Sequence, residues 1–173
     1  MQKKVDVAAL DSRKIYSLEL LKGKVALITG GSNGGMIKEI AKAFLVHGCS
    51  AVALMSRKAE KLQAVCTELD AISPNATCVA IPGDVRKYES CESVAKQVVE
   101  RFGKIDILVN GAAGNFLASA EKLSTNGFRT VMEIDTLGTF NMSKAVFNNS
   151  MKANRSGSIL NISALLHWNG TAF

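Results

Sequence analysis

The sequence predicts an α/β fold in which a parallel sheet carries helices on both faces. Short apolar runs rich in β-capable residues alternate with longer segments of helical periodicity along the chain. The first run, Val25 to Thr29, leads through a glycine-dense turn into a helical pattern. Gly, Ser, Asn, Asp or Arg residues follow each apolar run, where the carboxyl ends of parallel strands would meet. These observations together place a ligand site along that edge of the sheet.

The opening unit, Lys24 to Phe44, is a strand, a tight turn and a helix. Its turn holds the glycines Gly30, Gly31, Gly34 and Gly35. Such a turn lets backbone N–H groups approach an anion, and the following helix N-terminus carries partial positive charge. The unit therefore predicts a pyrophosphate site, and the alternative is that the glycines serve strand-to-helix packing only.

The remaining elements continue the alternation. Further strands are expected at 50–55, 77–81, 105–109 and 158–162, and further helices at 59–69, 89–102 and 126–152. With right-handed crossovers these segments make the first five strands of a Rossmann-like doubly wound parallel sheet. Residues 1–22 are expected to form an N-terminal arm, and residues 23–173 a dinucleotide-binding domain.

The composition restricts the class of partner. The chain has 173 residues, of which 47% are hydrophobic and 21% charged, as in ordinary soluble domains. No apolar run approaches the roughly 20 residues of a membrane-spanning helix. The net charge of +6 fits either a generally basic surface or a partner with several phosphates. Scattered basic residues and few aromatics argue against nucleic acid, and four dispersed cysteines without a CxxC pair argue against a metal site.

The end of the second strand indicates which dinucleotide binds. NAD-specific folds place a carboxylate there to hold the ribose 2′-hydroxyl. This chain has Ser56-Arg57-Lys58 instead, with no acid before Glu60. A guanidinium binds a 2′-phosphate in a bidentate manner, whereas a carboxylate would repel it. The sequence thus favours NADP(H) over NAD(H), and the alternative is a solvated basic turn that opens the next helix.

Four motifs resemble the short-chain dehydrogenase/reductase family, in its order and spacing. They are TGGSNGG at 29–35, DV at 84–85, NGAAG at 110–114 and GSILNIS at 157–163. Two further stretches, AAGNF at 112–116 and DTLGTFN at 135–141, resemble its peroxisomal 2,4-dienoyl-CoA reductases. The resemblance covers the chain from Lys22 onward.

The resemblance implies an activity. NADPH would deliver hydride to the δ-carbon of a trans-2,4-dienoyl-CoA, and protonation of the dienolate at its α-carbon would give a 3-enoyl-CoA. The subfamily lacks the usual catalytic tyrosine, and an acidic residue with a bound water is thought to supply the proton. A fatty acyl-CoA substrate, a homo-oligomer and a peroxisomal location are implied in the same way.

The resemblance also assigns residues. The cofactor-binding set is Gly30, Gly31, Ser32, Asn33, Gly34, Gly35, Arg57, Lys61, Asp84, Val85, Asn110 and Ala112. The set that would face the acyl-CoA is Arg86, Phe116, Ser124, Thr125 and Asn126. Asp135 takes the place of a helix asparagine found in most of the family, and is the candidate proton-relay carboxylate. The alternative for Asp135 is a helix residue hydrogen-bonded to nearby backbone.

Three departures from the family pattern stand out. Met36 occupies the place of the third glycine, where a side chain could push the helix from the strand. The usual serine position after the fifth strand holds Ala164, with Ser163 one residue earlier. The chain stops at Phe173, before the segment that would carry a catalytic lysine, and contains no Tyr-x-x-x-Lys. We therefore expect the 173-residue chain alone to be inactive, with strand 158–162 as an exposed edge.

Two other readings remain open. Another short-chain reductase, such as a 3-ketoacyl reductase, would have asparagine at Asp135 and a Tyr-x-x-x-Lys further on. A non-catalytic dinucleotide-binding protein would need neither group.

Overall fold

A computed structural model describes residues 11–72, 76–115 and 118–164, and in it five parallel strands form one sheet. The strands are β1 (Val25–Thr29), β2 (Ala51–Ser56), β3 (Thr77–Pro82), β4 (Ile107–Asn110) and β5 (Ser158–Asn161). Their order is β3-β2-β1-β4-β5, so the winding direction reverses between β1 and β4. This reversal is the point at which such sheets bind ligands. The predicted Rossmann-like doubly wound fold is confirmed.

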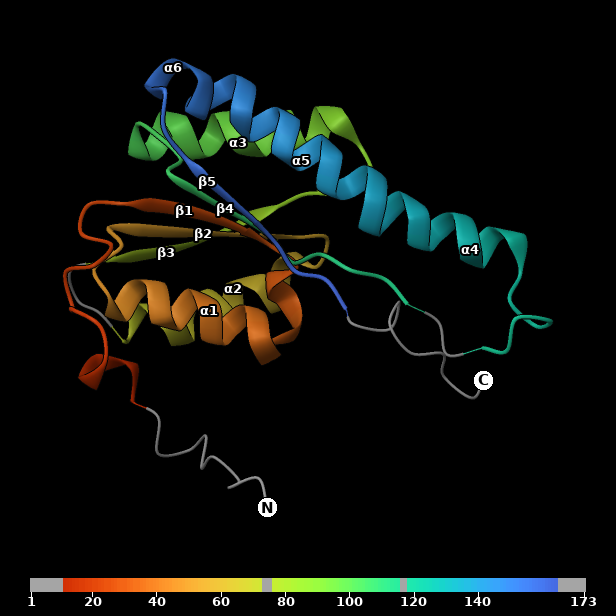
Figure 1. Cartoon of the computed structure of the whole chain (residues 1–173), viewed down its shortest axis with the longest axis horizontal. Coiled ribbons are helices and arrows are strands. Elements are labelled where there is room, and N and C mark those ends of the chain that lie inside the picture. Colours follow the sequence, from red (N-terminus) through yellow and green to blue (C-terminus); the bar gives the residue numbers. More distant parts are fainter. Residues whose placement is uncertain (1–10, 73–75, 116–117, 165–173) are drawn as a thin grey trace.

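Helices cover both faces of the sheet. The helices α1 (Gly35–Val46) and α2 (Ala59–Asp70) lie on one face, and α3 (Tyr88–Phe102) lies on the other (Figure 1). Every residue of β1 is buried, and successive side chains enter opposite cores. Ala26 and Ile28 pack with the α1 and α2 side, whereas Val25 and Leu27 pack with the α3 side. Two-sided burial explains why the strands read as continuous apolar runs without alternation.

One long helix accompanies α3 on its face of the sheet. It comprises α4 (Thr125–Met132), the π-helical η4 (Glu133–Leu137), α5 (Gly138–Val146), the π-helical η5 (Phe147–Met151) and α6 (Lys152–Asn154). The helix predicted at 126–152 is therefore confirmed, but with two π-helical stretches that its periodicity did not predict. π turns often occur at functional sites, and η4 lies beside the cavity described below.

The fourth strand differs from its predicted bounds. It was expected at 105–109 but runs from Ile107 to Asn110. The Ile105 N–H donates to Ser150 Oγ at 2.7 Å, and that hydroxyl donates back to the Ile105 carbonyl at 3.2 Å. The backbone of Ile105 is thus satisfied by a side chain of η5, which no local pattern could reveal.

The described part of the arm packs on the end of α1. His47, 4% exposed, follows this helix directly. Its ring nitrogens lie 2.9 Å from the Ser17 carbonyl oxygen and 3.0 Å from Ser12 Oγ. The Leu21 N–H donates to the His47 carbonyl at 2.8 Å. His47 therefore anchors the arm to the sheet domain.

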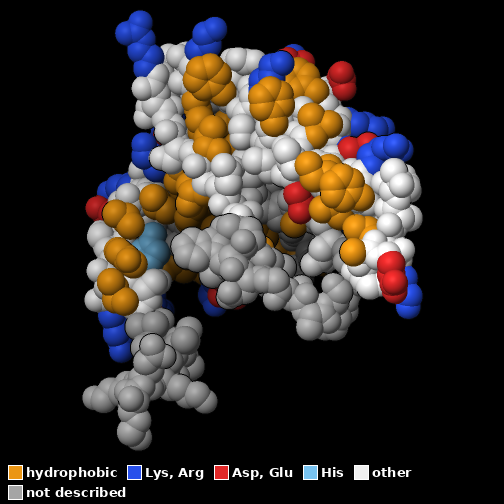
Figure 2. All heavy atoms as spheres, turned by 45° about the vertical axis from the view of Figure 1, so that its right-hand side comes forward, with side chains coloured by type: hydrophobic (Ala, Val, Ile, Leu, Met, Phe, Trp, Pro, Cys, Tyr) orange, Lys and Arg blue, Asp and Glu red, His pale blue; other side chains and the backbone are white. Residues whose placement is uncertain are grey.

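Two apolar surfaces are open to solvent. All residues of β5 are exposed, including Ile159 and Leu160, and the expected exposed edge is confirmed. Exposed aromatic side chains also lie along the long helix at Phe128, Phe140 and Phe147. Figure 2 shows hydrophobic side chains gathered on the side of the molecule that it views. Within the described ranges, no helix has both the length and the apolarity to cross a membrane.

Candidate functional site

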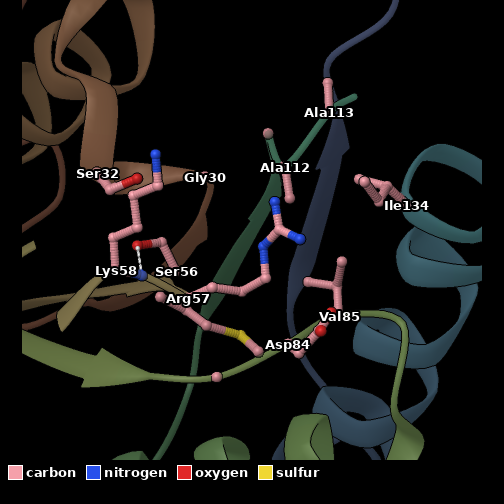
Figure 3. Close-up of a pocket in the computed structure, with 13 residues that line it drawn as sticks. Gly30, Ser32, Ser56, Arg57, Lys58, Asp84, Val85, Ala112, Ala113 and Ile134 are labelled. Carbon is pink, nitrogen blue, oxygen red and sulfur yellow. Dashed lines mark hydrogen bonds between the residues drawn. The ribbon is translucent and has the colours of Figure 1, made fainter. Parts of the chain in front are cut away.

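A cavity of about 320 Å³ opens at the carboxyl ends of four strands. Its lining comes from the segments that follow β1, β2, β3 and β4, together with η4 (Figure 3). The lining residues are Gly30, Ser32, Met55, Ser56, Arg57, Lys58, Gly83, Asp84, Val85, Gly111, Ala112, Ala113 and Ile134. Four of the five predicted strand-end groups therefore meet in one place.

The turn after β1 crosses the loop after β4 in direct contact. Gly30 has φ +87°, and a Cβ at this position would lie 2.5 Å from the Gly111 carbonyl oxygen. The Gly111 and Ala112 N–H groups both donate to Thr29 Oγ1 at 3.0 Å. Only glycine has the conformation and the small volume that this crossing requires. The crossing brings the β1 turn and the β4 loop together as one wall.

The start of α1 can accept an anion. Gly34 and Gly35 have φ values of +68° and +59°, and no side chain caps the helix there. The first N–H groups of an uncapped helix lack intrahelical partners and carry partial positive charge. Such a helix start suits an anion, and Gly30 and Ser32 of the turn line the cavity. The pyrophosphate contact of Gly30 to Gly35 stays a prediction.

Met36 does not disturb this geometry. Its side chain is 60% exposed and therefore lies away from the sheet. The next residue, Ile37, faces the sheet instead, and a Cβ on Gly111 would overlap Ile37 Cδ1. Close packing of helix and strand thus comes from Gly111 on the neighbouring loop. The expectation that Met36 could push the helix away from the strand is wrong.

The end of β2 supplies two cations to the cavity. Arg57 and Lys58 both line it, and Arg57 extends across it toward Asp84 and Ala112 (Figure 3). Lys61, predicted as the second phosphate ligand, is exposed on α2 and is not among the lining residues. Lys58 belongs to the basic turn seen in the sequence, but it was not predicted as a phosphate ligand. Only the direction of the chain into α2 distinguishes the two lysines.

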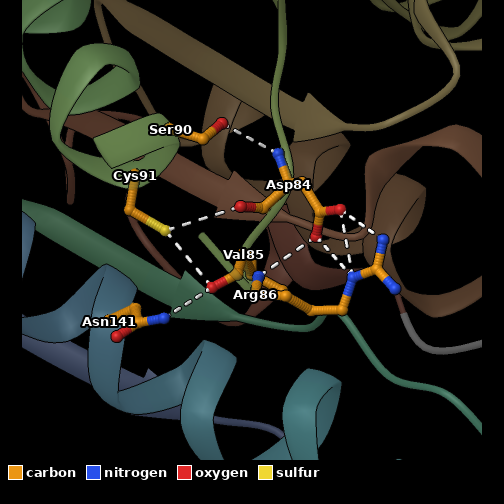
Figure 4. A network of polar contacts seen from close by, with 6 residues as sticks. All are labelled: Asp84, Val85, Arg86, Ser90, Cys91 and Asn141. Atoms are coloured by element: carbon orange, nitrogen blue, oxygen red, sulfur yellow. Dashed lines mark hydrogen bonds and ion pairs between the residues drawn. The ribbon is translucent and has the colours of Figure 1, made fainter. Parts of the chain in front are cut away.

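Asp84 lines the cavity across from Arg57, and its carboxylate is bound by Arg86. Arg86 Nη2 lies 2.5 Å from Asp84 Oδ2, and Arg86 Nε lies 3.0 Å from each carboxylate oxygen (Figure 4). These side-chain bonds hold the pKa of Asp84 below its ordinary value, against desolvation, which raises it. Arg57 adds a smaller lowering effect on this pKa. Arg86, predicted to face acyl-CoA, is thus engaged with Asp84 beside the cavity.

The lowered pKa of Asp84 predicts a pH dependence of stability. Because the folded pKa lies below the unfolded value of about 4, the stabilisation is complete above that value. It is lost as the pH falls through the folded pKa. We expect the melting temperature of the wild type to fall more steeply than that of Asp84→Asn as the pH falls below about 4. Parallel melting curves over this range would contradict the assignment.

Asp135 lies in η4, next to the cavity-lining Ile134. Its Oδ1 accepts a hydrogen bond from the Gly114 N–H at 2.8 Å, and the residue is exposed. The alternative role for Asp135 was a helix residue hydrogen-bonded to nearby backbone, and the structure contains such a bond. Asp135 is nevertheless exposed to solvent. The proton-relay role stays a prediction.

Three other residues predicted to face acyl-CoA, Ser124, Thr125 and Asn126, are not among the cavity-lining residues. Ser124 caps α4, because its Oγ accepts from the Gly127 N–H at 3.0 Å. Thr125 and Asn126 are exposed in the first turn of that helix. Phe116 lies outside the described residues. The helix α4 projects beyond the carboxyl edge of the sheet (Figure 1).

Asn110 forms a buried junction behind the cavity. Its Nδ2 lies 3.0 Å from Ser143 Oγ and 2.9 Å from Asn161 Oδ1. Its own Oδ1 is buried and has no hydrogen-bond partner among the described residues. The side chain ties β4 to β5 and to α5. Its predicted contact with the nicotinamide-side ribose is not tested by this arrangement.

Sequence reasoning missed several lining residues. Gly111 and Ala113 line the cavity and belong to the loop after β4. The sequence predicts that this loop lies at the ligand edge of the sheet, but these two residues were not among the predicted site residues. Ile134 lies in the π-helical η4, so a prediction based on the ends of strands could not include it. In the described part of the chain, no group of three or more His, Cys, Asp or Glu side chains could hold a metal ion.

The arrangement fits a dinucleotide. An uncapped helix N-terminus behind a glycine turn suits a pyrophosphate, and Arg57 with Lys58 suits a further phosphate. Val85, Ala112 and Ile134 supply apolar walls for flat rings.

Comparison with known proteins agrees with this fit. The short chain dehydrogenase family matches residues 24–172. A peroxisomal 2,4-dienoyl-CoA reductase from Danio rerio is 44% identical over 158 residues, covering 91% of this chain and 51% of the relative. A protein of the same name from Arabidopsis thaliana is 44% identical over 160 residues, covering 88% of this chain and 52% of the relative. The chain thus spans about half the length of these curated relatives.

Solved structures are similar as well. A short chain dehydrogenase from Bacillus anthracis has a TM-score of 0.79 at 36% identity, covering 87% of this chain and 61% of that one. An alcohol dehydrogenase from Thermococcus sibiricus, complexed with 5-hydroxy-NADP, has a TM-score of 0.70 at 33% identity. The match to it covers 79% of this chain and 57% of that one.

Proposed function

Because this chain belongs to the short-chain dehydrogenase family, we propose that its cavity binds NADP(H) for the reduction of trans-2,4-dienoyl-CoA to 3-enoyl-CoA. The observation that carries the proposal is the position of Arg57 and Lys58 in the same cavity as the glycine turn. The names of the relatives from Danio rerio and Arabidopsis thaliana support the dienoyl-CoA substrate class.

Different residues of this chain would bind different parts of the cofactor. Gly30 to Gly35 and the α1 N-terminus would hold the pyrophosphate, while Asp84 and Val85 would contact the adenine. Arg57 and Lys58 would hold the 2′-phosphate. When bound, NADPH supplies the hydride. Asp135 would relay a proton toward the α-carbon of the acyl group, through a water at its exposed carboxylate.

The phosphate assignment predicts a loss of cofactor affinity on charge reversal. Arg57→Asp replaces a bidentate donor with a group that repels phosphate, so the Kd for NADPH should rise about 30-fold or more. The Kd for NADH should change much less, because NADH lacks the 2′-phosphate. Quenching of NADPH and NADH fluorescence measures both values. A matched charge reversal, Lys96→Asp on α3, should leave both Kd values unchanged. Unchanged NADPH binding in Arg57→Asp would refute the assignment.

The activity is tested on the full-length protein with two substrates. Oxidation of NADPH by hexa-2,4-dienoyl-CoA, with a 3-enoyl-CoA as product, is the expected result. Turnover of a 3-ketoacyl-CoA in its place would identify the other class of short-chain reductase. Tight NADPH binding without turnover of either substrate would indicate a non-catalytic binding protein.

Self-association and location belong to the same proposal. Phe128 and Phe140, 58% and 60% exposed on the long helix, would pack against a second copy of the chain. Sedimentation velocity of the full-length protein tests this assembly. The peroxisomal location rests on the names of the relatives.

A further inference from the structure

The loop between β3 and α3 forms one wall of the cavity through Gly83, Asp84 and Val85. Its backbone is held by side chains from two helices (Figure 4). Ser90 Oγ on α3 accepts a hydrogen bond from the Asp84 N–H at 3.0 Å. Asn141 Nδ2 on α5 donates to the Val85 carbonyl at 3.0 Å. The position of this wall therefore depends on contacts from outside the loop.

Asn141 makes the stronger of two side-chain bonds to the Val85 carbonyl. The second donor is the Cys91 thiol, whose Sγ lies 3.5 Å from the same oxygen, and a thiol is a weak donor. Asn141 is only 5% exposed, at a position where helix periodicity calls for an apolar side chain. One turn earlier, a Cβ on Gly138 would lie 2.6 Å from Val85 Cγ2, so the helix approaches this loop closely. The buried amide thus satisfies a buried carbonyl that would otherwise lack a strong partner.

The same helix holds the other side of the cavity. Asp135 accepts from the Gly114 N–H, and Ser143 Oγ accepts from Asn110 Nδ2. Both of these bonds reach the β4 loop or strand, whereas Asn141 alone among these three residues reaches the β3 loop. Side chains of one long helix thus bond to the segments on both sides of the cavity.

We propose that Asn141 is a positioning residue, which keeps Asp84 and Val85 at the cofactor wall without touching the cofactor. The proposal rests on the proposed function, that the cavity binds NADP(H). Asn141→Leu keeps the branched shape and the number of side-chain heavy atoms, and removes the donor. The Val85 carbonyl then keeps only the thiol, the loop shifts, and the Kd for NADPH should rise about fivefold or more. The kcat at saturating NADPH should stay within about twofold, because the reacting groups lie elsewhere.

A matched control separates positioning from general loss of stability. Asn149 on the same helix donates to the Ala145 carbonyl at 2.8 Å, a bond within the helix that touches no loop. Asn149→Leu also loses one side-chain-to-backbone bond, and should leave the Kd for NADPH unchanged. Ser90→Ala loosens the other anchor of the same loop at a half-buried position, and should raise the Kd in the same direction.

Fluorescence titration and thermal melting of the full-length protein and its variants decide the matter. A raised Kd in Asn141→Leu and Ser90→Ala, beside an unchanged Kd in Asn149→Leu, supports the proposal. A lowered melting temperature in Asn141→Leu with unchanged Kd overturns it, because the role is then merely structural. If Asn141→Leu does not fold, an unchanged Kd in Ser90→Ala overturns it. A wild type that binds neither NADPH nor NADH refutes the proposed function itself.

Discussion

Asp135→Asn should lower kcat/KM for a 2,4-dienoyl-CoA by about 100-fold or more, because an amide cannot relay a proton. The amide oxygen can still accept the Gly114 N–H, so the local structure and the Kd for NADPH should be retained. Loss of activity with unchanged cofactor binding is the signature of a group that acts on the reacting atoms. Steady-state oxidation of NADPH by the full-length protein measures the effect.

The neighbouring carboxylate provides the control for Asp135. Glu133 lies in the same π-helical turn, and Glu133→Gln removes a charge of the same sign without removing the relay. It should retain most of the activity. If Asp135→Asn keeps full activity while Asp135→Ala loses it, the residue serves only to hold the Gly114 loop. That result would establish the alternative, in which Asp135 is hydrogen-bonded to nearby backbone.

Gly30→Ala should cost about 3 kcal/mol of the free energy of unfolding and abolish cofactor binding. A left-handed φ of +87° costs an L-residue about 1–2 kcal/mol. The new Cβ would also lie 2.5 Å from the Gly111 carbonyl oxygen, which is backbone and cannot rotate away. The two loops must then separate, and overpacking of this kind costs about 1–3 kcal/mol more. The urea midpoint of unfolding and NADPH fluorescence measure the two effects.

Gly103 offers the matched control for Gly30. It has φ +81° at the end of α3, and a Cβ there would meet nothing within 4 Å. Gly103→Ala therefore carries only the conformational cost, about 1–2 kcal/mol, and should leave cofactor binding intact. Equal losses of stability in the two variants would show that the contact between the β1 turn and the β4 loop is unimportant.

The sequence alone determined the elements and the edge on which the site lies. Continuous apolar runs predicted two-sided strands, and all five strands occur in the expected parallel sheet. The cavity lies where the carboxyl ends of the strands were predicted to meet, because parallel strands end at the same edge of the sheet. Arg57 was selected for the same reason, and it lines the cavity. The strands and the position of the cavity were predictable because they depend on local periodicity and on the topology of a parallel sheet, while the phosphate contact of Arg57 stays a prediction.

Only the tertiary structure decided which neighbouring side chain enters the cavity. Lys58 lines it and Lys61 does not, since the chain turns into α2 between them. Ile134 lines the cavity, and Asn141 donates a hydrogen bond to Val85 in its wall. Both residues lie on a helix that is distant in sequence from the strand ends. Met36 is exposed, while its neighbour Ile37 packs closely on Gly111, which lies far along the chain. Each outcome depends on side-chain direction and long-range contact, which hydrophobic periodicity and motif spacing do not encode.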